Sequence, residues 1–227
     1  MVSKRVGILG SAFDPPHYGH AAMAILALES DAVEEIWLCP SPDRWDKTPV
    51  QSLDTREKWA SLLAQRLTAA GFPTFVSNEE RDLGVYRGTY VFLKHLNQKY
   101  PTNTFAPIVG WDAWESLNTW RDPTVGILNG NLLREEFPFL IVPRNLKNNP
   151  QQAHLDSLSV SKPHLMLPTF ATLQQKHGSL FSIHCNEIAN LSSSAIRKAL
   201  ATQQIILFAF PEIEEKIKCS GIYTKSS

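Results

Sequence analysis

The sequence predicts an α/β fold, a doubly wound parallel sheet with helices on both faces. Short apolar runs, which are typical of buried strands, alternate along the chain with longer stretches of helical periodicity. Strands that alternate with helices form parallel sheets covered on both faces. We therefore expect a Rossmann-like arrangement, in which ligands bind at the carboxyl ends of the strands.

Each predicted element rests on its own signals. The predicted strands are short apolar runs, and the first of them, RVGILG, ends on a glycine. Asp54 would cap the second helix, Pro101 follows the third, and Pro211 and Gly221 flank the last. In chain order we expect strand Arg5–Gly10, helix Gly19–Ser30, strand Glu35–Cys39, helix Asp54–Ala70, strand Thr74–Ser77, helix Gly88–Lys99, strands Phe105–Gly110, Phe139–Pro143 and Leu180–Cys185, and helices Ser193–Ala201 and Pro211–Lys218.

The composition favours a single domain over residues 1–227, with 43% apolar residues for its core. Basic and acidic residues number 22 each, so the net charge of zero gives no general attraction to nucleic acid or to a membrane surface. Three cysteines without a C-x-x-C pair, no signal-like start and no long apolar span indicate a cytoplasmic protein. The polar stretch 145–179 is interpreted as a peripheral insertion without a firm boundary. The sequence leaves open whether the protein forms a homo-oligomer.

Two histidines lie in the segment that follows the first predicted strand. The sequence GSAFDPPHYGH places His17 and His20 at a helix start, with Gly19 between them, where a side chain would crowd a ligand. A helix N-terminus attracts anions and imidazoles add donors, so this segment fits a phosphate chain. The pattern alone would also fit a metal pair or an incidental polar helix start. The backbone groups expected to bind the same phosphates belong to Gly10, Ser11, Ala12 and Phe13.

A second pattern, LSSSAIRK, spans Leu191–Lys198. Serines suit a helix start because their hydroxyls cap exposed N–H groups. Arg197 lies one turn inside and can lean back toward that start. Ser193, Ser194 and Arg197 are therefore expected to bind phosphate oxygens, although this pattern alone would also fit a capped helix with a surface arginine.

In this order, the two patterns resemble the H-x-G-H nucleotidyltransferase superfamily, and more narrowly the nicotinate or nicotinamide mononucleotide adenylyltransferases. GSAFDPPHYGH is similar to their G-G-T-F-D-P-x-H-x-G-H, with Ser11 and Ala12 in place of Gly and Thr. LSSSAIR is similar to their I-S-S-T-x-I-R, with Ser194 in place of Thr. The resemblance implies that His17, His20 and Arg197 are catalytic.

Further segments resemble the ligand-binding segments of the same enzymes. VGWDAWESLNTW is similar to their G-x-D-x-L-x-x-L-x-x-W. The resemblance implies that Gly110 and Asp112 bind ATP and that Trp120 stacks on the nicotinate ring. Trp111 and Trp114 are interpreted as core or rim aromatics.

Three shorter matches complete the resemblance. RGTYVFL is similar to a helix opening of these enzymes, which implies that Thr89 and Tyr90 bind the mononucleotide. Lys47, in the loop after the second strand, is similar to a lysine with a catalytic and mononucleotide-binding role. Arg144, after the fifth strand, is similar to an ATP-binding arginine.

The resemblance implies attack by the mononucleotide phosphate on the α-phosphorus of ATP, with Mg²⁺ carried mainly with ATP. Donors at the RGTY helix start and the nearby Arg87 favour the nicotinate form. Three alternatives stay open: an H-x-G-H enzyme acting on phosphopantetheine or a phospho-alcohol, a protein similar to class I aminoacyl-tRNA synthetases, and an inactive nucleotide-binding regulator. Neither G-x-x-x-x-G-K-[ST] nor G-x-G-x-x-G is present, which disfavours a P-loop ATPase and a dinucleotide-binding dehydrogenase.

Overall fold

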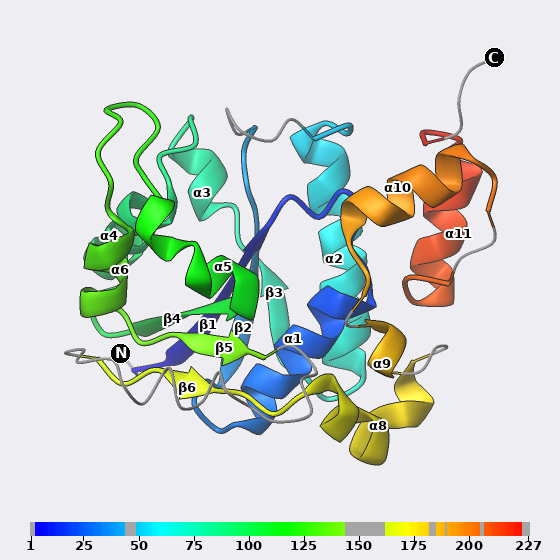
Figure 1. Ribbon diagram of the computed structural model, residues 1–227, viewed down its shortest axis with the longest axis horizontal. Coiled ribbons are helices and arrows are strands. Elements are labelled where there is room, and N and C mark those ends of the chain that lie inside the picture. The colour runs from blue at the N-terminus through cyan, green and yellow to red at the C-terminus, as the bar shows by residue number, and fades with distance from the viewer. Residues whose placement is uncertain are drawn as a thin grey trace.

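A parallel sheet forms the centre of the protein (Figure 1). The computed structural model describes residues 3–43, 49–143, 162–181, 185–188, 190–204 and 207–223. Within them the strand order is β3-β2-β1-β4-β5-β6 and all neighbouring strands are parallel, which confirms the predicted fold class. The strands are β1 (Arg5–Ser11), β2 (Glu35–Pro40), β3 (Thr74–Val76), β4 (Thr104–Gly110), β5 (Leu140–Val142) and β6 (Leu165–Met166).

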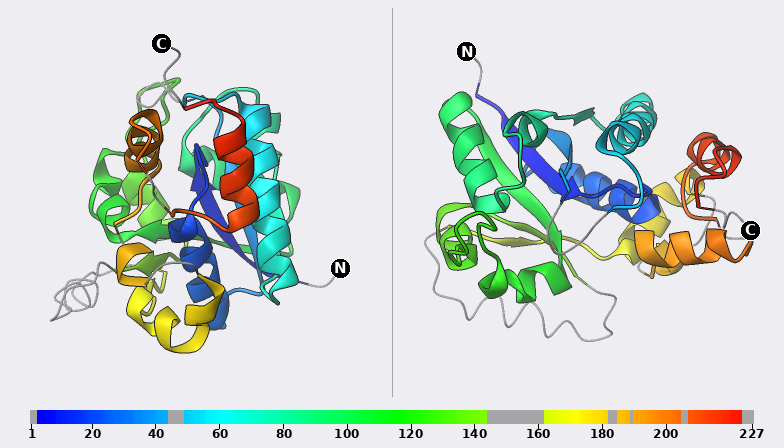
Figure 2. Two further views of the ribbon diagram at one scale, coloured as in Figure 1. Left: turned by 90° about the vertical axis from the view of Figure 1, so that its right-hand side faces the viewer. Right: turned by 90° about the horizontal axis from the view of Figure 1, so that it is seen from above.

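Helices cover both faces of this sheet (Figure 2). On one face α1 and α2 pack against β1, β2 and β3 through one apolar core. On the other face α4 and α5 pack against β4 through a second core. The α-helices are α1 (Tyr18–Glu29), α2 (Leu53–Ala69), α3 (Glu79–Asp82), α4 (Thr89–Lys99), α5 (Trp111–Glu115), α6 (Gly130–Glu136), α8 (Phe170–His177), α9 (Cys185–Ile188), α10 (Ser193–Ala201) and α11 (Pro211–Cys219).

The winding of the chain reverses between β1 and β4. From β1 the chain continues to β2 and β3 on one side, and then crosses to β4, β5 and β6 on the other side. Loops that leave two strands at such a switch point diverge, and the crevice between them is where ligands bind in this kind of sheet. Ser11 ends β1 and Gly110 ends β4, so these residues mark the crevice.

The prediction of a sixth strand at Leu180–Cys185 is wrong. Leu180 ends a short 3-10 helix and Cys185 begins α9, while residues 182–184 lie outside the described ranges. The sixth strand is instead β6, which pairs with β5 through only two residues. So short a strand at the sheet edge, with Leu165 40% exposed, carries no periodic pattern that a sequence could reveal.

The described part of the stretch 145–179 contributes to the sheet and to the core. It contains β6 and α8, and Leu167, Phe170 and Leu173 belong to the core that covers α1. Residues 144–161 lie outside the described ranges.

The helix starts differ slightly from the predictions. Ser52, rather than Asp54, caps α2, because its side chain accepts the N–H of Thr55. His17 caps α1, one residue before the helix begins at Tyr18. At the far end, α11 lies beside α2 (Figures 1 and 2). None of the helices in the described ranges is long and apolar enough to cross a membrane.

Candidate functional site

A cavity of about 440 Å³ lies at the carboxyl ends of β1, β4 and β5. One side of it is polar and the other is apolar, which suits a ligand with both a phosphate chain and a base. The polar lining comes from Ser11, His17, His20, Asp112, Ser192 and Ser193. The apolar lining includes Met23, Trp111, Val142, Phe170, Ile188 and Leu191.

A larger cavity, of about 800 Å³, lies at the opposite edge of the sheet. Its lining is mainly apolar and includes Val33, Phe105, Phe139 and Leu140. Neither histidine of the H-x-G-H segment reaches it. The smaller cavity is therefore the candidate site, because it collects the residues with reactive or phosphate-binding chemistry.

His17 and His20 cap the start of α1 reciprocally. The Nδ1 atom of His17 accepts the N–H of Gly19 at 3.1 Å, and the Nδ1 atom of His20 accepts the N–H of His17 at 3.2 Å. This is the geometry of a capping box, with imidazoles in place of the usual hydroxyl and carboxylate. The three-residue spacing of the two histidines therefore follows from helix geometry.

The capping contacts also determine where each imidazole carries its hydrogen. A ring nitrogen that accepts a hydrogen bond has no hydrogen of its own, so each neutral ring carries its hydrogen on Nε2. The Nε2 atom of His20 lies 2.9 Å from the Oγ atom of Ser11, so His20 donates to that hydroxyl. The two rings lie with their centroids 4.0 Å apart, and both residues are more than nine-tenths buried.

The N–H groups at the start of α1 already have partners within the protein. Tyr18 donates its N–H to the carbonyl of Phe208 at 2.7 Å, and His20 donates its N–H to the carbonyl of His17 at 2.9 Å. With Gly19 bonded to the His17 ring, the expected direct contact between these N–H groups and a phosphate is not available. The two histidines themselves line the cavity.

Gly19 is required by the His17 ring. A Cβ atom at this position would lie 2.9 Å from both Cε1 and Nδ1 of that ring. From the sequence we expect a side chain at Gly19 to crowd a bound ligand, whereas in the structure it would crowd the protein's own His17 ring. Gly10 and Gly110 differ from Gly19, because a Cβ atom at either would meet nothing within 4 Å.

The loop after β1 turns sharply at Phe13. Its φ of 49° lies in the left-handed region, which costs a residue of this type about 1 to 3 kcal/mol. The side chain of Phe13 is fully buried and packs on the His20 ring at 4.7 Å between centroids. The N–H of Phe13 points to the Ser11 hydroxyl at 3.5 Å. The strained turn is thus held by packing around the histidine.

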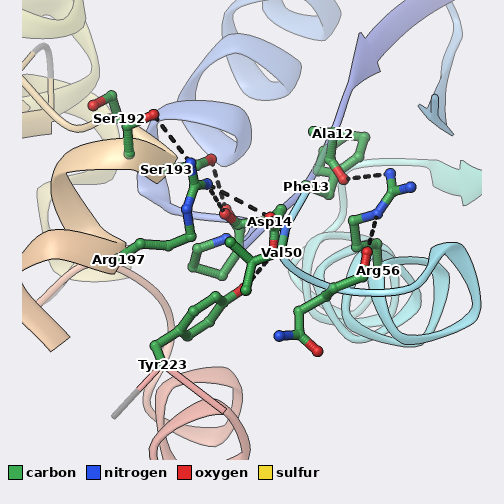
Figure 3. Close-up of polar contacts among 12 residues, drawn as sticks. Ala12, Phe13, Asp14, Val50, Arg56, Ser192, Ser193, Arg197 and Tyr223 are labelled. Atoms are coloured by element: carbon green, nitrogen blue, oxygen red, sulfur yellow. Dashed lines mark hydrogen bonds and ion pairs between the residues drawn. The ribbon is translucent and has the colours of Figure 1, made fainter. Parts of the chain in front are cut away.

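Arg56, in α2, holds the same loop in place through hydrogen bonds (Figure 3). Its side chain has no exposed surface, and it donates to the carbonyl oxygens of Ala12, Ser41 and Gln51 at 3.0, 2.7 and 3.0 Å. Burial lowers the pKa of the guanidinium. The sequence patterns gave no signal for this residue, because its partners are mainly backbone atoms.

Arg197 joins the second motif to the first (Figure 3). Its Nη1 atom donates to the backbone carbonyl of Asp14 at 2.5 Å and lies 3.6 Å from the carboxylate of the same residue. The Asp14 carboxylate also accepts hydrogen bonds from the Val50 N–H at 2.6 Å and from the Tyr223 hydroxyl. The start of α10 is therefore held directly against the loop that carries the histidines.

The serines of the second motif have three different partners. Ser192 caps α10 by accepting the N–H of Ala195 at 3.2 Å, and Ser193 donates to the carbonyl of Pro15 at 3.0 Å. Ser194 accepts from Nη2 of Arg197 at 3.2 Å. Of the predicted phosphate-binding residues in this motif, Ser193 lines the cavity, while Ser194 and Arg197 lie outside its lining.

The segment after β4 divides between the cavity and the core. Gly110, Trp111 and Asp112 line the cavity, and Asp112 belongs to the first turn of α5. Trp114 is 1% exposed and packs in the second core, as interpreted from the sequence. Trp120 packs against the same core and lies outside the cavity lining.

The start of α4 lies beside the segment that follows Trp120. A Cβ atom on Gly88 would lie 2.7 Å from the carbonyl of Arg121, so the two backbones are in close contact. Thr89 begins α4, which has no side-chain cap. Tyr90 donates its hydroxyl to Glu136 at 2.7 Å. The structure thus brings the predicted mononucleotide residues near one another, outside the lining of the histidine cavity.

Two predicted site residues, Lys47 and Arg144, lie outside the described residues. Within the described ranges, no group of three or more His, Cys, Asp or Glu residues could hold a metal ion.

Known proteins show the following similarities to this chain. A family model described as cytidylyltransferase-like matches residues 8–199. A probable nicotinate-nucleotide adenylyltransferase of Bacillus cytotoxicus is 33% identical over 119 residues, so the match spans 52% of this chain and only 61% of that relative. Another of the same description, from Bacteroides fragilis, is 26% identical over 219 residues, which are 96% of this chain and 92% of that protein.

Solved structures are similar to this fold. Plasmodium falciparum nicotinic acid mononucleotide adenylyltransferase complexed with NaAD superposes with a TM-score of 0.71 at 20% identity, over 97% of each chain. The same enzyme complexed with APC gives a TM-score of 0.67 at 18% identity, again over 97% of each chain. At these identities the likeness concerns the fold.

Proposed function

The chain belongs to the cytidylyltransferase-like family, and we propose that it transfers the AMP part of ATP to nicotinate mononucleotide. The observation that carries this proposal is the meeting of two distant motifs. His17, His20 and Ser193 line one cavity, and Arg197 is bonded to the loop that bears the histidines. The names of the relatives in Bacillus cytotoxicus and Bacteroides fragilis support the same substrates.

In the proposed reaction a phosphate oxygen of the mononucleotide attacks the α-phosphorus of ATP. The bond from that phosphorus to the oxygen bridging to the β-phosphate breaks, and pyrophosphate leaves. The nucleophile is already anionic, so no covalent enzyme intermediate is required. The protein positions two phosphates and offsets their repulsion, which is the main contribution of proteins to phosphoryl transfer.

The two histidines are proposed to donate hydrogen bonds to the reacting phosphates. Both imidazoles carry their hydrogen on Nε2 when neutral. Because His20 Nε2 donates to the Ser11 hydroxyl in this structure, we propose that it exchanges this partner for a phosphate oxygen when substrate binds, and that His17 also donates to phosphate. Arg197, Ser193 and Ser194 are proposed to stabilise the triphosphate, Gly10 and Gly110 leave room for it, and Asp112 is proposed to bind the ribose. Lys47 and Arg144 are proposed to assist on the mononucleotide and ATP sides.

Magnesium is proposed to reach the site with ATP. The polar side chains at the cavity are mainly imidazoles and hydroxyls, which suit phosphate oxygens better than a hard cation. Mg²⁺ usually keeps several waters and binds substrate phosphates in such sites. When bound there, it would neutralise phosphate charge.

The mononucleotide is proposed to bind beside the start of α4. Trp120 supplies an aromatic ring, and Thr89 and Tyr90 lie in the first turn of an uncapped helix. We further propose that residues 1–227 form a single domain and that the reaction takes place in the cytoplasm.

Pyrophosphate release from ATP tests the activity. Nicotinate mononucleotide, nicotinamide mononucleotide and phosphopantetheine are supplied in turn under identical magnesium. We expect release with a pyridine mononucleotide, and a His17→Ala, His20→Ala double variant serves as the inactive control. Release only with phosphopantetheine would favour the alternative enzyme class. Release with none of them would favour a nucleotide-binding regulator.

A further inference from the structure

We propose that Tyr223 is a positioning residue, which acts through the Asp14 carboxylate to hold Arg197 in place for ATP. This inference rests on the proposed function. Tyr223 follows α11 and lies 209 residues from Asp14 in the sequence, yet its hydroxyl bonds directly to that carboxylate (Figure 3). None of the sequence patterns includes Tyr223.

The Asp14 carboxylate is a buried charge whose partners are few and specific. The residue has no exposed surface. Its carboxylate oxygens accept hydrogen bonds from the Val50 N–H and from the Tyr223 hydroxyl. The guanidinium of Arg197 lies at 3.6 Å, beyond ordinary hydrogen-bond distance. Two neutral donors therefore satisfy this carboxylate without drawing Arg197 fully onto it.

Arg197 is instead held by the backbone carbonyl of Asp14 at 2.5 Å and by Ser194. Its side chain remains 21% exposed, so it is partly open to solvent. It matters that Arg197 is held by a carbonyl and a hydroxyl rather than by the Asp14 carboxylate. A guanidinium paired tightly with a buried carboxylate would have less charge to offer a triphosphate.

Tyr223 is well suited to remain a donor. Its ring is 8% exposed and packs near Trp59, with the ring centroids 5.9 Å apart. Burial and the neighbouring Asp14 raise the pKa of its hydroxyl far above the physiological range, so the hydroxyl keeps its proton.

Removal of this hydroxyl would leave one side of a buried carboxylate without its donor, which is costly. Two guanidiniums interact with this carboxylate, those of Arg56 and Arg197. Arg56 is held by three carbonyl oxygens, so Arg197 is the cation that can compensate, by closing the 3.6 Å separation. That movement draws the guanidinium toward Asp14. A misplacement of about 1 Å in such a site can cost up to about 100-fold in rate.

The test is the Tyr223→Phe variant, which keeps the ring and removes the hydroxyl. The matched control is Tyr100→Phe, which removes a hydroxyl that donates to Glu79 at 2.6 Å, at the opposite end of β4. We expect Tyr223→Phe to lower kcat/KM for ATP by about tenfold, with the KM for the mononucleotide close to wild type and the protein still folded. Tyr100→Phe should change neither substrate's kinetics.

A double-mutant cycle with Arg197→Lys separates positioning from general support of the loop. If Tyr223 acts through Arg197, Tyr223→Phe should cost less than about twofold in the Arg197→Lys background, because coupled residues are not additive. An equal loss in both backgrounds would overturn the proposal. So would a loss shared equally by ATP and the mononucleotide, since that indicates a loosened loop.

ATP binding, measured by calorimetry on the same four proteins, distinguishes this inference from the proposed function. If wild type releases no pyrophosphate yet Tyr223→Phe weakens ATP binding, the proposed function fails and the positioning role stands. If wild type is active and Tyr223→Phe binds and uses ATP normally, only the positioning role fails. No ATP binding by wild type would overturn both.

Discussion

Arg87 and Asp122 form an ion pair, with Nη2 2.8 Å from Oδ2. The guanidinium expected to face the ring substituent of the mononucleotide is therefore already partnered. The pair also joins the residue before Gly88 to the segment after Trp120, so it organises the proposed mononucleotide site. Selection between acid and amide must then come chiefly from the uncapped start of α4.

We predict a preference for nicotinate mononucleotide over the amide form. A carboxylate only accepts hydrogen bonds, and the N–H groups and positive end of a helix favour it. The measurement is kcat/KM for both mononucleotides under identical magnesium and ATP. A preference of about tenfold or more for the amide would show that this interpretation of the ring pocket is wrong.

The Arg87–Asp122 pair should make stability depend on acid pH. Hydrogen bonds from Arg87, and then from Thr124, lower the pKa of Asp122 from 3.8 to about 2. Because the folded pKa is depressed, the stabilisation is present above pH 3.8 and is lost as the pH falls through 2. Asp122→Asn should therefore lower the urea midpoint near neutral pH, and the difference from wild type should narrow as the pH falls below 3.8.

The control for this experiment is Asp54→Asn, which removes the carboxylate of a more exposed ion pair with Arg81. Exposed pairs contribute little to stability, so this variant should follow wild type at each pH. If the urea midpoints of Asp122→Asn and wild type differ by the same amount at every pH, the stabilisation does not come from the ionised Asp122 carboxylate.

His20→Ala should reduce kcat by at least about 100-fold, which corresponds to about 2.7 kcal/mol of transition-state stabilisation. The variant also loses the cap on the His17 N–H, so a stability loss of about 0.5 to 2 kcal/mol is expected while the fold survives. His177→Ala is the control, because that histidine pairs with Glu29 on the surface of α1. Near-normal kcat in folded His20→Ala would exclude the proposed site.

Arg197→Lys should lower activity while α10 stays intact, since Ser192 caps that helix independently. Lysine keeps the charge but cannot bond Asp14 and Ser194 at once through a planar fork. Steady-state kinetics, compared with Arg66→Lys as a surface control, provide the measurement. If Arg197→Lys has the same kcat and KM as wild type, the LSSSAIRK segment is only a capped helix and Arg197 has no role in the reaction.

Gly19→Ala should be harmful, although alanine usually stabilises a helix over glycine by about 0.5 to 1 kcal/mol. The new Cβ would lie 2.9 Å from the His17 ring and displace it. Gly10→Ala is the matched comparison, because its Cβ meets no protein atom within 4 Å. We expect Gly10→Ala to fold like wild type and to raise the KM for ATP. If Gly19→Ala is as active as wild type, the position of the His17 ring does not matter for the reaction.

The order of strands β1 to β5 and of helices α1, α2, α4, α10 and α11 could be predicted from the sequence, because each has its own periodicity or its own end signals. The histidine spacing was readable for a similar reason, since a capping turn places residues three apart. The two-residue strand β6 has no period, and its partner β5 is brought to it only by tertiary packing.

The residues that hold the histidine loop and Arg197 in place could not be predicted from the sequence. Arg56 bonds mainly backbone carbonyls, which leave no mark in a sequence, and Tyr223 meets Asp14 across 209 residues. The position of the N–H groups at the start of α1 was predicted correctly. Their acceptors were not, because the His17 ring accepts from Gly19 only in one side-chain rotamer and the Phe208 carbonyl comes from a distant segment. Periodicity cannot report either of these.

The attachments of Arg56 bear on how this loop tolerates sequence change. At Ala12, Ser41 and Gln51 the guanidinium grips carbonyl oxygens, which every amino acid possesses. A change of side chain at those three positions does not remove these hydrogen bonds, whereas at position 56 the bonds depend on the guanidinium itself. Ala12 in place of Thr therefore need not alter the turn, whereas Ser11 in place of Gly adds a hydroxyl that bonds the His20 ring.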